Sequence, residues 1–404
     1  MNLDILVYTG LFVGLYFAIF IMATFFENKD KIYKKAKKDF LPRICFIVPC
    51  YNEQDNIEQT IASLLMIDYP KDKLEIIVVD DGSKDKTFEK ALLFQKYGVR
   101  VFRKENGGKH TALNFAIKKT DAPFIGTLDA DSYIKPNALK KMMAQFEDDN
   151  AMACISTIKI SKMNNIVEGI QYVEFILSAF FKKMYSLLGS VMATPGPLSV
   201  FRKEIFDIVG PYKKAYQTED LEFAFRIQNS NFKIASAIDA IVYTKPCSNM
   251  KDLLFQRLRW CRGFLLNLID YPCLLNIKKH GNLSFFLFYN LLGRCLSVAF
   301  LFFAIWKTIC FLMEKINYYL LVGIDSSMFS ININSINIKP TIILTGISLC
   351  IFIMYLIMSK KLTFDYRSIK KQGFMYILLY TFLNATWWIG AIFLSFSKKD
   401  VFWK

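Results

Sequence analysis

Apolar residues follow two patterns in this chain, with short runs in its middle part and long uninterrupted stretches towards both ends. From Ile5 to Phe26 no residue is charged, and about 20 apolar residues are enough to cross a bilayer. Three further apolar stretches cover residues 283–313, 341–358 and 374–396. The pattern predicts an N-terminal membrane anchor at 1–27, a cytoplasmic soluble domain at 28–275 and a C-terminal membrane cluster at 276–404.

The first apolar stretch is predicted to be an uncleaved anchor rather than a secretory signal. No Lys or Arg precedes it, and no small-residue cleavage site closes it before Glu27. The residues that follow are rich in Lys: Lys29, Lys31, Lys34, Lys35, Lys37 and Lys38. Cytoplasmic loops carry an excess of Lys and Arg, so we expect the soluble domain on the cytoplasmic side of the plasma membrane.

The charge between the C-terminal stretches bears on how often the chain crosses the membrane. Residues 359–373 are rich in Lys and Arg and are expected to be cytoplasmic, whereas residues 314–340 have few basic residues and suit an external loop. Four spans would place both termini outside. Arg294 interrupts the long second stretch, and three basic residues argue against an external C-terminus: Lys398, Lys399 and Lys404. The alternative is that one stretch lies in the membrane interface instead of crossing.

Between the anchor and the C-terminal cluster, strand-like apolar runs alternate with helical spacings. The strand runs are 44–48, 74–79, 99–102 and 124–128, and the helical spacings include 56–66 and 112–118. This alternation predicts an α/β fold with a mostly parallel sheet covered by helices on both faces. Ligands of such sheets bind beyond the carboxyl ends of the strands. Residues 49–53, 80–83 and 129–131 fall at those ends.

A long amphipathic helix is predicted from Asn165 to Leu188, where apolar residues repeat every three or four positions. An ordinary core-packing helix would have the same pattern. The Phe content and the flanking apolar stretches favour a helix that lies in the membrane interface. A second helix is predicted at about 250–266.

The net charge is explained better by a membrane surface than by nucleic acid. The chain has 51 Lys and Arg against 35 Asp and Glu, a formal net charge of +16. Basic residues concentrate beside the apolar stretches, where they attract anionic lipid headgroups. The nine Cys form no CxxC pair and are predicted to be reduced, and with only two His a His-based metal site is not expected.

Asp129 and Asp131 follow the predicted strand at 124–128. Two carboxylates at this spacing can direct oxygens towards one hard cation, with water and a substrate phosphate completing the shell. A D-x-D sequence is also common in solvated turns. Its place at the carboxyl end of a strand favours the metal site.

Asn106, Gly107, Gly108 and Lys109 precede the helix predicted at 112–118. Backbone N–H groups at a helix start and a nearby Lys suit an anionic diphosphate. The Asn-Gly pair is equally typical of a plain turn.

Thr218, Glu219 and Asp220 open a further helical run. As a capping arrangement, acids near a helix N-terminus stabilise the helix dipole. As a catalytic group, Asp220 would be a general base. Burial beside a substrate would raise its pKa towards a value useful for catalysis.

Gln256, Arg259 and Trp260 share one face of the helix predicted at 250–266. Trp provides a flat wall for a sugar ring, Arg a fork of donors for phosphate, and Gln a hydrogen-bonding group for hydroxyls. A membrane-proximal Arg with a Trp anchor would also have this sequence.

The order of these motifs is more specific than any one of them. Together they resemble the "D, DxD, TED, QxxRW" signature of processive family-2 glycosyltransferases, the group of bacterial cellulose, hyaluronan, chitin and poly-N-acetylglucosamine synthases. The resemblance covers about residues 42–265. It includes residues 49–53, the Gly107–Asn114 stretch and residues 195–202. A soluble glycosyltransferase would lack QxxRW. The size and single N-terminal span are most similar to poly-N-acetylglucosamine synthases.

The resemblance implies a GT-A fold, a nucleotide-sugar donor, most often UDP-linked, and Mg²⁺ or Mn²⁺. It places Pro49, Tyr51, Glu53, Asp80 and Asp81 around the nucleoside, and Lys109 at the diphosphate. Asp129 would contact donor and metal, and Asp131 would be a direct metal ligand. Asp220 would be the base, beside Glu219. Gln256, Arg259 and Trp260 would hold the acceptor end and the diphosphate.

The activity implied is inverting polymerisation of a UDP-sugar, first choice UDP-N-acetylglucosamine, into a β-linked polysaccharide exported through the membrane. The partners implied are the growing chain and the bilayer, with an accessory membrane subunit as a further expectation. Regulation by a cyclic dinucleotide through a PilZ-type domain, as in cellulose synthases, is not expected. Two rivals remain: transfer of one sugar to a polyprenyl phosphate or other lipid, and a non-catalytic membrane scaffold.

Overall fold

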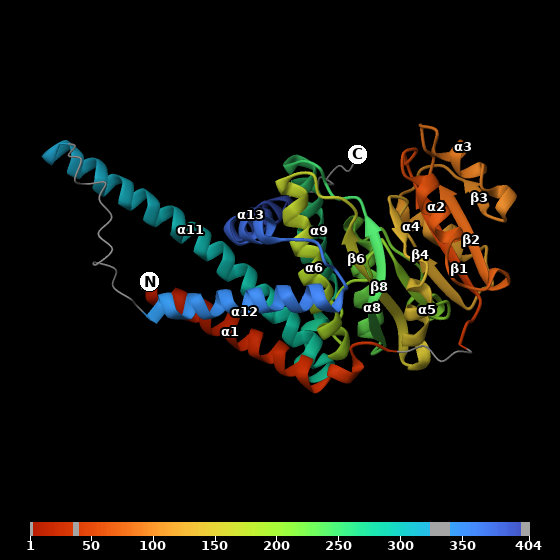
Figure 1. Cartoon of the computed structure of the whole chain (residues 1–404), viewed down its shortest axis with the longest axis horizontal. Helices are drawn as coiled ribbons and strands as arrows, with labels where there is room; N and C mark the ends of the chain where they lie inside the picture. Colours follow the sequence, from red (N-terminus) through yellow and green to blue (C-terminus); the bar gives the residue numbers. More distant parts are fainter. Residues whose placement is uncertain (1–2, 35–39, 324–339, 397–404) are drawn as a thin grey trace.

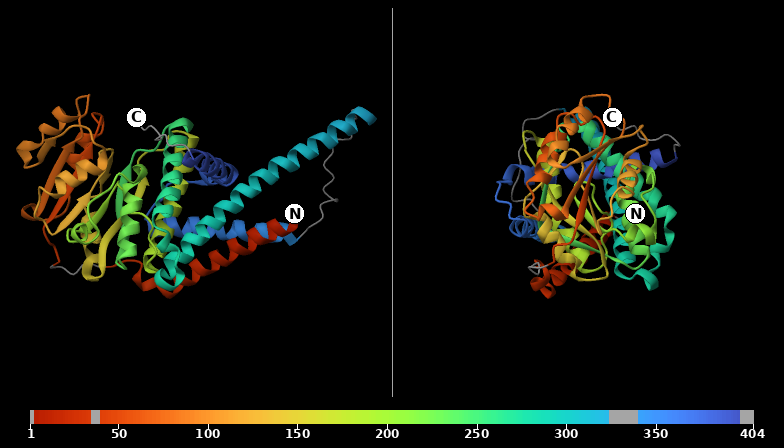
Figure 2. Two further views of the ribbon diagram at one scale, coloured as in Figure 1. Left: turned by 180° about the vertical axis from the view of Figure 1, so that it is seen from behind. Right: turned by 90° about the vertical axis from the view of Figure 1, so that its right-hand side faces the viewer.

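The protein is elongated, with a sheet-containing domain at one end and long helices at the other (Figures 1 and 2). The computed structural model describes residues 3–34, 40–323 and 340–396. Lys35, Lys37 and Lys38, for which a cytoplasmic position is predicted, lie outside these ranges, as do the C-terminal Lys398, Lys399 and Lys404.

A mixed sheet of eight strands, in the order β3-β2-β1-β4-β7-β6-β8-β5, forms the centre of the first domain. The strands are β1 (Ile44–Cys50), β2 (Leu74–Asp80), β3 (Arg100–Arg103), β4 (Phe124–Thr127), β5 (Ser132–Ile134), β6 (Ala151–Ile160), β7 (Ser199–Arg202) and β8 (Lys233–Thr244). The four predicted strand runs are β1 to β4, which pair in parallel. Strand β7 pairs antiparallel with β4 and β6, and β5 pairs antiparallel with β8.

Helices cover both faces of this sheet because its strands are apolar on both sides. Phe46 and Val48 of β1 join one buried cluster, whereas Cys45 and Ile47 join another on the opposite face. The first cluster includes residues of α2 (Ile57–Leu65), α3 (Thr87–Leu92) and α5 (Ala138–Met143). The second includes residues of α4 (Lys109–Ile117), α7 (Ile205–Val209) and α8 (Glu219–Asn229).

Two long helices, α6 (Ile166–Leu187) and α9 (Met250–Asp270), lie between the sheet and the long apolar helices (Figure 1). Each begins at an Asn whose side chain accepts a backbone N–H of the first turn, Asn165 from Glu168 and Asn249 from Asp252, both at 2.9 Å. Helix α6 contacts β6 and β8 on one side and α12 (Pro340–Leu362) and α13 (Lys370–Phe396) on the other. Helix α6 therefore joins the sheet to two of the apolar helices.

Four helices of the described residues are long and apolar enough to cross a membrane: Val7–Glu27 within α1 (Leu3–Glu27), Asn282–Leu321 within α11 (Asn282–Val322), Ile342–Leu362 within α12 (Pro340–Leu362), and α13 (Lys370–Phe396). A short helix, α10 (Ile277–His280), precedes α11. The loop expected from residue 314 is wrong for residues 314–322, which continue α11. Glu314 and Lys315 interrupt the apolar run there without breaking the helix. Residues 324–339 of that expected loop lie outside the described ranges.

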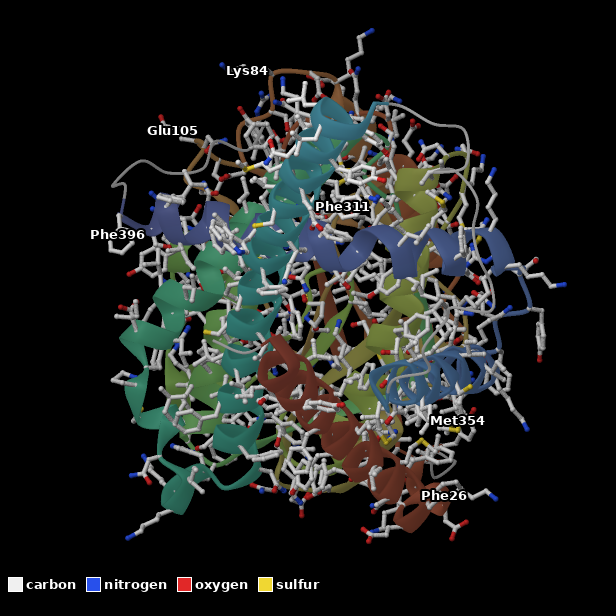
Figure 3. All side chains as sticks on the ribbon, turned by 90° about the vertical axis from the view of Figure 1, so that its left-hand side faces the viewer. Phe26, Lys84, Glu105, Phe311, Met354 and Phe396 are labelled. Carbon is white, nitrogen blue, oxygen red and sulfur yellow. The ribbon has the colours of Figure 1, made fainter. Side chains whose placement is uncertain are left out.

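Helix α13 has a different direction from the other three apolar helices. Viewed along the long axis of the molecule, α13 extends across the picture to Phe396, whereas α12 is seen almost end-on and α1 runs obliquely down to Phe26 (Figure 3). It packs against α9 and α6 over much of its length. Trp387 and Trp388 of α13 are buried against Leu253 and Cys261 of α9.

The segment between α12 and α13 is fixed to the sheet by a buried ion pair. Lys159 of β6 lies 3.2 Å from Asp365, and both side chains are less than 5% exposed. Asp365 also accepts a hydrogen bond from Tyr172 of α6 at 2.8 Å and pairs with Arg367 at 2.8 Å. Arg367 in turn donates to the carbonyl of Ile160 at 2.8 Å. Hydrogen bonds from Arg367 and Tyr172 hold the pKa of Asp365 below its usual range although burial opposes this.

We expect Asp365→Ala to lower the free energy of unfolding by about 3–5 kcal/mol, because removing one partner leaves Lys159 buried without a counter-charge. Chemical unfolding in detergent measures the loss. Asp68→Ala is the matched control, since the Asp68–Lys140 pair is 2.7 Å long but well exposed and should contribute at most about 1 kcal/mol. Equal losses in the two variants would contradict the assignment.

Candidate active site

The carboxyl ends of β1, β2 and β4 meet at one edge of the sheet. The register pairs Cys50 with Asp80 at the ends of β1 and β2, and β4 beside them leads into Asp129. The structure therefore brings together the three polar segments that the sequence places after these strands.

Asp80 and Asp81 are both buried and both hydrogen-bonded within the chain. Asp80 lies 3.2 Å from Arg103. Asp81 pairs with Lys104 at 2.6 Å and accepts the N–H groups of Gly107 and Gly108, the latter at 2.8 Å. The glycine amides that the sequence suggests for a diphosphate are thus directed at Asp81.

Residues 49–53 form the rim beside Asp81. The N–H of Asn52, whose φ is +54°, donates to Ser83 at 2.9 Å, and the N–H of Glu53 donates to Thr87 at 2.7 Å. Burial raises the pKa of the Glu53 carboxyl, although a hydrogen bond from Asn56 opposes the rise. Tyr51 is 38% exposed and open to a ligand, and Pro49 ends up within β1.

Lys109 stands at the start of α4 between two carboxylates. Its ammonium lies 2.5 Å from Asp129 and 3.7 Å from Glu219. Burial alone would lower the pKa of Lys109, but these carboxylates raise it above its ordinary value. Gly196 approaches the pair so closely that a Cβ there would lie 2.4 Å from the Lys109 ammonium. Only glycine fits this approach without moving the pair.

Asp131 accepts a hydrogen bond from Ser132 at 2.8 Å. Burial, together with the negative charge of Asp129, raises the pKa of Asp131 to about 6. The backbone between the two acids is held by Thr60 of α2, whose hydroxyl donates to the Ala130 carbonyl at 2.8 Å.

Asp220 lies in the first turn of α8. Its carbonyl accepts both the N–H and the hydroxyl of Thr194, at 3.1 and 2.9 Å. Burial and the neighbouring Glu219 raise the pKa of Asp220, while Lys109 and Arg259 act in the opposite direction. Lys182 of α6 also faces Asp220, and its own pKa falls to about 8 because burial outweighs the attraction of Asp220 and Glu174.

The polar side chains of α9 near the site bind different partners. Arg259 donates to the carbonyl of Gln217, just before the Thr218–Asp220 segment. Gln256 accepts a hydrogen bond from Arg257 at 2.9 Å. Arg257 pairs with Glu174 of α6 at 2.6 Å and lies over the ring of Trp260 at 4.0 Å from its centroid. Trp260 remains 36% exposed.

Four residues of this region are absent from the sequence prediction: Lys104, Lys182, Arg257 and Asn267. Lys104 and Lys182 belong to no recognisable motif. Only tertiary packing brings Lys104 to Asp81 and Lys182 to Asp220. Asn267 lies eight residues after Arg259 on the same helix. Helical periodicity could therefore have indicated that Asn267 lies towards the side of Arg259.

Residues 45–210 match the sequence profile of the family described as glycosyl transferase family 2. Over the whole chain, the structure is similar to a mannosyltransferase from Pyrobaculum calidifontis solved in complex with GDP-Man and Mn²⁺. The TM-score is 0.63 at 15% identity, with 98% of each chain covered. The expected α/β glycosyltransferase fold is thereby confirmed.

Two curated relatives with similar sequences carry the same enzyme name. A 268-residue segment is 27% identical to poly-beta-1,6-N-acetyl-D-glucosamine synthase of Staphylococcus aureus strain MSSA476, and covers 64% of this chain and 65% of that protein. The enzyme of the same name from Staphylococcus epidermidis is 26% identical over 268 residues. The match thus spans about two-thirds of the length of these relatives.

Proposed function

We propose that this chain is an inverting, processive membrane glycosyltransferase that polymerises a UDP-sugar, first choice UDP-N-acetylglucosamine, into a β-linked polysaccharide. The observation that carries the proposal is the convergence of Lys109, Asp129, Glu219, Asp220 and Arg259, from four separate parts of the chain, at the carboxyl edge of the sheet. The names of the curated relatives support this activity. We also propose the division into an anchor at 1–27, a catalytic domain at 28–275 and a membrane cluster at 276–404.

On the donor side, Pro49, Tyr51, Glu53, Asp80 and Asp81 would surround the nucleoside. Tyr51 offers an exposed ring, and the fixed position of Asp81 between Lys104 and the glycine amides keeps its carboxylate in one orientation. Lys109 would meet the donor diphosphate, which would replace Asp129 as its partner.

Asp129 and Asp131 would hold Mg²⁺ or Mn²⁺. Within residues 3–34, 40–323 and 340–396, no group of three or more His, Cys, Asp or Glu is placed to hold a metal. The chain would therefore contribute two carboxylates, and the donor and water the remaining ligands. Burial and the charge of Asp129 raise the pKa of Asp131. A divalent cation bound between the two carboxylates would stabilise their ionised forms. When bound, the ion would neutralise charge on the diphosphate.

Asp220 would remove the proton from an acceptor hydroxyl, which then attacks the anomeric carbon from the face opposite the leaving diphosphate. The bond from oxygen to carbon forms as the bond from carbon to the diphosphate breaks, so the configuration inverts. Lys109 and Arg259 would neutralise the negative charge that develops on the diphosphate. Gln256, Arg259 and Trp260 would hold the acceptor end, for which the exposed Trp260 ring offers an apolar surface.

The crosswise direction of α13 supports three crossing helices, α1, α11 and α12, with α13 in the cytoplasmic interface beside α6 and α9. The N-terminus would then lie outside and the C-terminus on the catalytic side. Basic residues at the ends of these helices fit the rule that cytoplasmic segments are positive: Lys29, Lys31, Lys278, Lys279, Lys360, Lys361, Lys370 and Lys371. The growing chain would leave through the membrane helices. An accessory membrane subunit is a further expected partner.

We expect Asp220→Asn to lower kcat by about 10²- to 10⁴-fold, the usual value of general base catalysis. Donor affinity should stay within about twofold, because the amide keeps the shape of the side chain. UDP release and calorimetric UDP binding measure the two effects. Asp149→Asn, at a fully exposed acid, is the control. A variant that keeps wild-type turnover would exclude Asp220 as the base.

Chelation should abolish UDP release, and added Mn²⁺ or Mg²⁺ should restore it. Asp131→Asn should then require about tenfold or more metal for half-maximal rate, because one of two charged ligands is lost. The control is Asp121→Asn, which lies on an exposed turn. Full activity of the wild-type protein in excess chelator would contradict the metal site.

The acid limb of the kcat–pH profile should reflect Asp220, which works only when ionised. Burial and Glu219 raise its pKa, so the limb should lie above the range of an ordinary Asp, and activity should rise with pH through it. Its charged or titratable neighbours are Glu219, Lys109, Arg259, Lys182 and Tyr212. Lys182→Met removes a cation and should move the limb to higher pH, and an unmoved limb would contradict this reading.

The experiment that tests the proposed function as a whole is UDP release by purified protein in liposomes with Mn²⁺. UDP-N-acetylglucosamine, UDP-glucose and UDP-glucuronate would be supplied singly and in pairs, and the product sized on a gel. Turnover of one donor with a high-mass product supports a polymer synthase. A single sugar on added polyprenyl phosphate would instead show a lipid transferase, and the absence of UDP release in every mixture would indicate a missing lipid acceptor or partner subunit before it indicated a scaffold.

A further inference from the structure

The turn that precedes the proposed base has an unusual backbone. Ala215, Tyr216 and Gln217 have φ values of +43°, +55° and +63°. Left-handed conformations are unfavourable for residues with a Cβ, by roughly 1–2 kcal/mol each. Three of them in sequence persist only when surrounding contacts hold the turn in place.

Those contacts come from one face of α9. Arg259 donates to the carbonyl of Gln217, Asn267 donates to the hydroxyl of Thr218 at 2.9 Å, and Asp270 accepts the hydroxyl of Tyr216 at 3.0 Å. Arg259, Gly263, Asn267 and Asp270 are spaced by four, four and three residues, so they follow one stripe of the helix.

Within this stripe, the contact between Asn267 and Thr218 is the most buried. Asn267 is 0% exposed and Thr218 is 3% exposed. The Asn267 amide also donates to the Gly263 carbonyl at 2.8 Å, and the Thr218 hydroxyl donates to the Ala215 carbonyl at 2.9 Å. The hydroxyl therefore links Asn267 to the start of the left-handed turn.

Gly263 allows α9 to come this close. A Cβ at this position would lie 2.3 Å from the Thr218 hydroxyl and 2.4 Å from its methyl carbon. A short, branched side chain such as Thr cannot move aside by that amount without moving its own backbone.

We propose that Asn267 is a positioning residue for the reaction, which holds Thr218 and the left-handed turn so that Asp220 points at the acceptor. The proposal rests on the proposed function, in which Asp220 is the base. Asn267 acts through Thr218, two residues before Asp220, and does not itself contact the reacting groups. Since α9 also packs on α13, the position of Asp220 depends on how α9 and α13 pack against each other.

The test compares kcat and donor KM for Asn267→Leu, Thr218→Val and Thr218→Ser in liposomes. We expect the first two to lower kcat by about 10- to 100-fold, the loss typical of a small displacement of a catalytic group, with donor KM within about twofold. Thr218→Ser keeps the hydroxyl and should retain kcat within about threefold. The double variant Asn267→Leu/Thr218→Val should lose no more than either single variant, because both remove the same contact.

Tyr33→Phe is the control, since it removes a hydrogen bond of an exposed tyrosine hydroxyl, to the Leu362 carbonyl, outside the turn, and it should stay within about twofold. Wild-type kcat in Thr218→Val and Asn267→Leu overturns the proposal, as does equal impairment of Thr218→Ser and Thr218→Val. If Asn267→Leu does not fold, Thr218→Val and Thr218→Ser still decide. Asp220→Asn in the same assay separates the two levels: if it stays active, the proposed base itself fails.

Discussion

The constraint on which this site depends is the repulsion among carboxylates gathered at one edge of the sheet. Asp129, Asp131, Glu219 and Asp220 come from two distant segments. Burial raises the pKa of Asp131 and of Asp220, and the negative charges of Asp129 and Glu219 raise them further. Lys109 is the cation between the two pairs, at 2.5 Å from one and 3.7 Å from the other. Such an arrangement is unfavourable in an empty site, and under the proposed function a cation and a donor would offset the repulsion.

Holding these charges together requires a rigid frame, and the frame is shared with the membrane helices. The sheet fixes the strand ends, the Pro195–Pro197 turn passes close to Lys109, and α9 fixes the segment before Asp220. Helix α9 packs on α13, and the segment before α13 is fixed back to the sheet through Lys159 and Asp365. The catalytic edge and the apolar helices are therefore parts of one packed body.

The sequence predicted most elements of this fold, because apolar spacing reports burial directly. The runs at 44–48, 74–79, 99–102 and 124–128 became β1 to β4. The antiparallel entry of β7 and β5 could not be predicted, since strand direction depends on distant partners. Helix α11 is longer than expected because Glu314 and Lys315 end the apolar run but not the helix.

For the site, the sequence predicted which residues lie at the strand ends but not how they pair with one another. The amides of Gly107 and Gly108 bind Asp81, a pairing that involves residues 26 and 27 positions apart. Asn267 has an ordinary residue type in an ordinary helix, and its role depends on the close approach that Gly263 permits. Helical spacing could have indicated the side of α9 on which Asn267 lies, but its contact with Thr218 follows only from the fold.

The length of α11 sets how far the protein reaches on the side away from the sheet. Its 41 residues correspond to about 60 Å of helix, twice the roughly 30 Å of a bilayer's hydrocarbon core. The part from Asn282 to Trp306 is long enough for one crossing with some tilt. Lys307, Glu314 and Lys315 follow it, and their charges suit water. The last turns of α11 would therefore stand out from the bilayer as a stalk of about 24 Å.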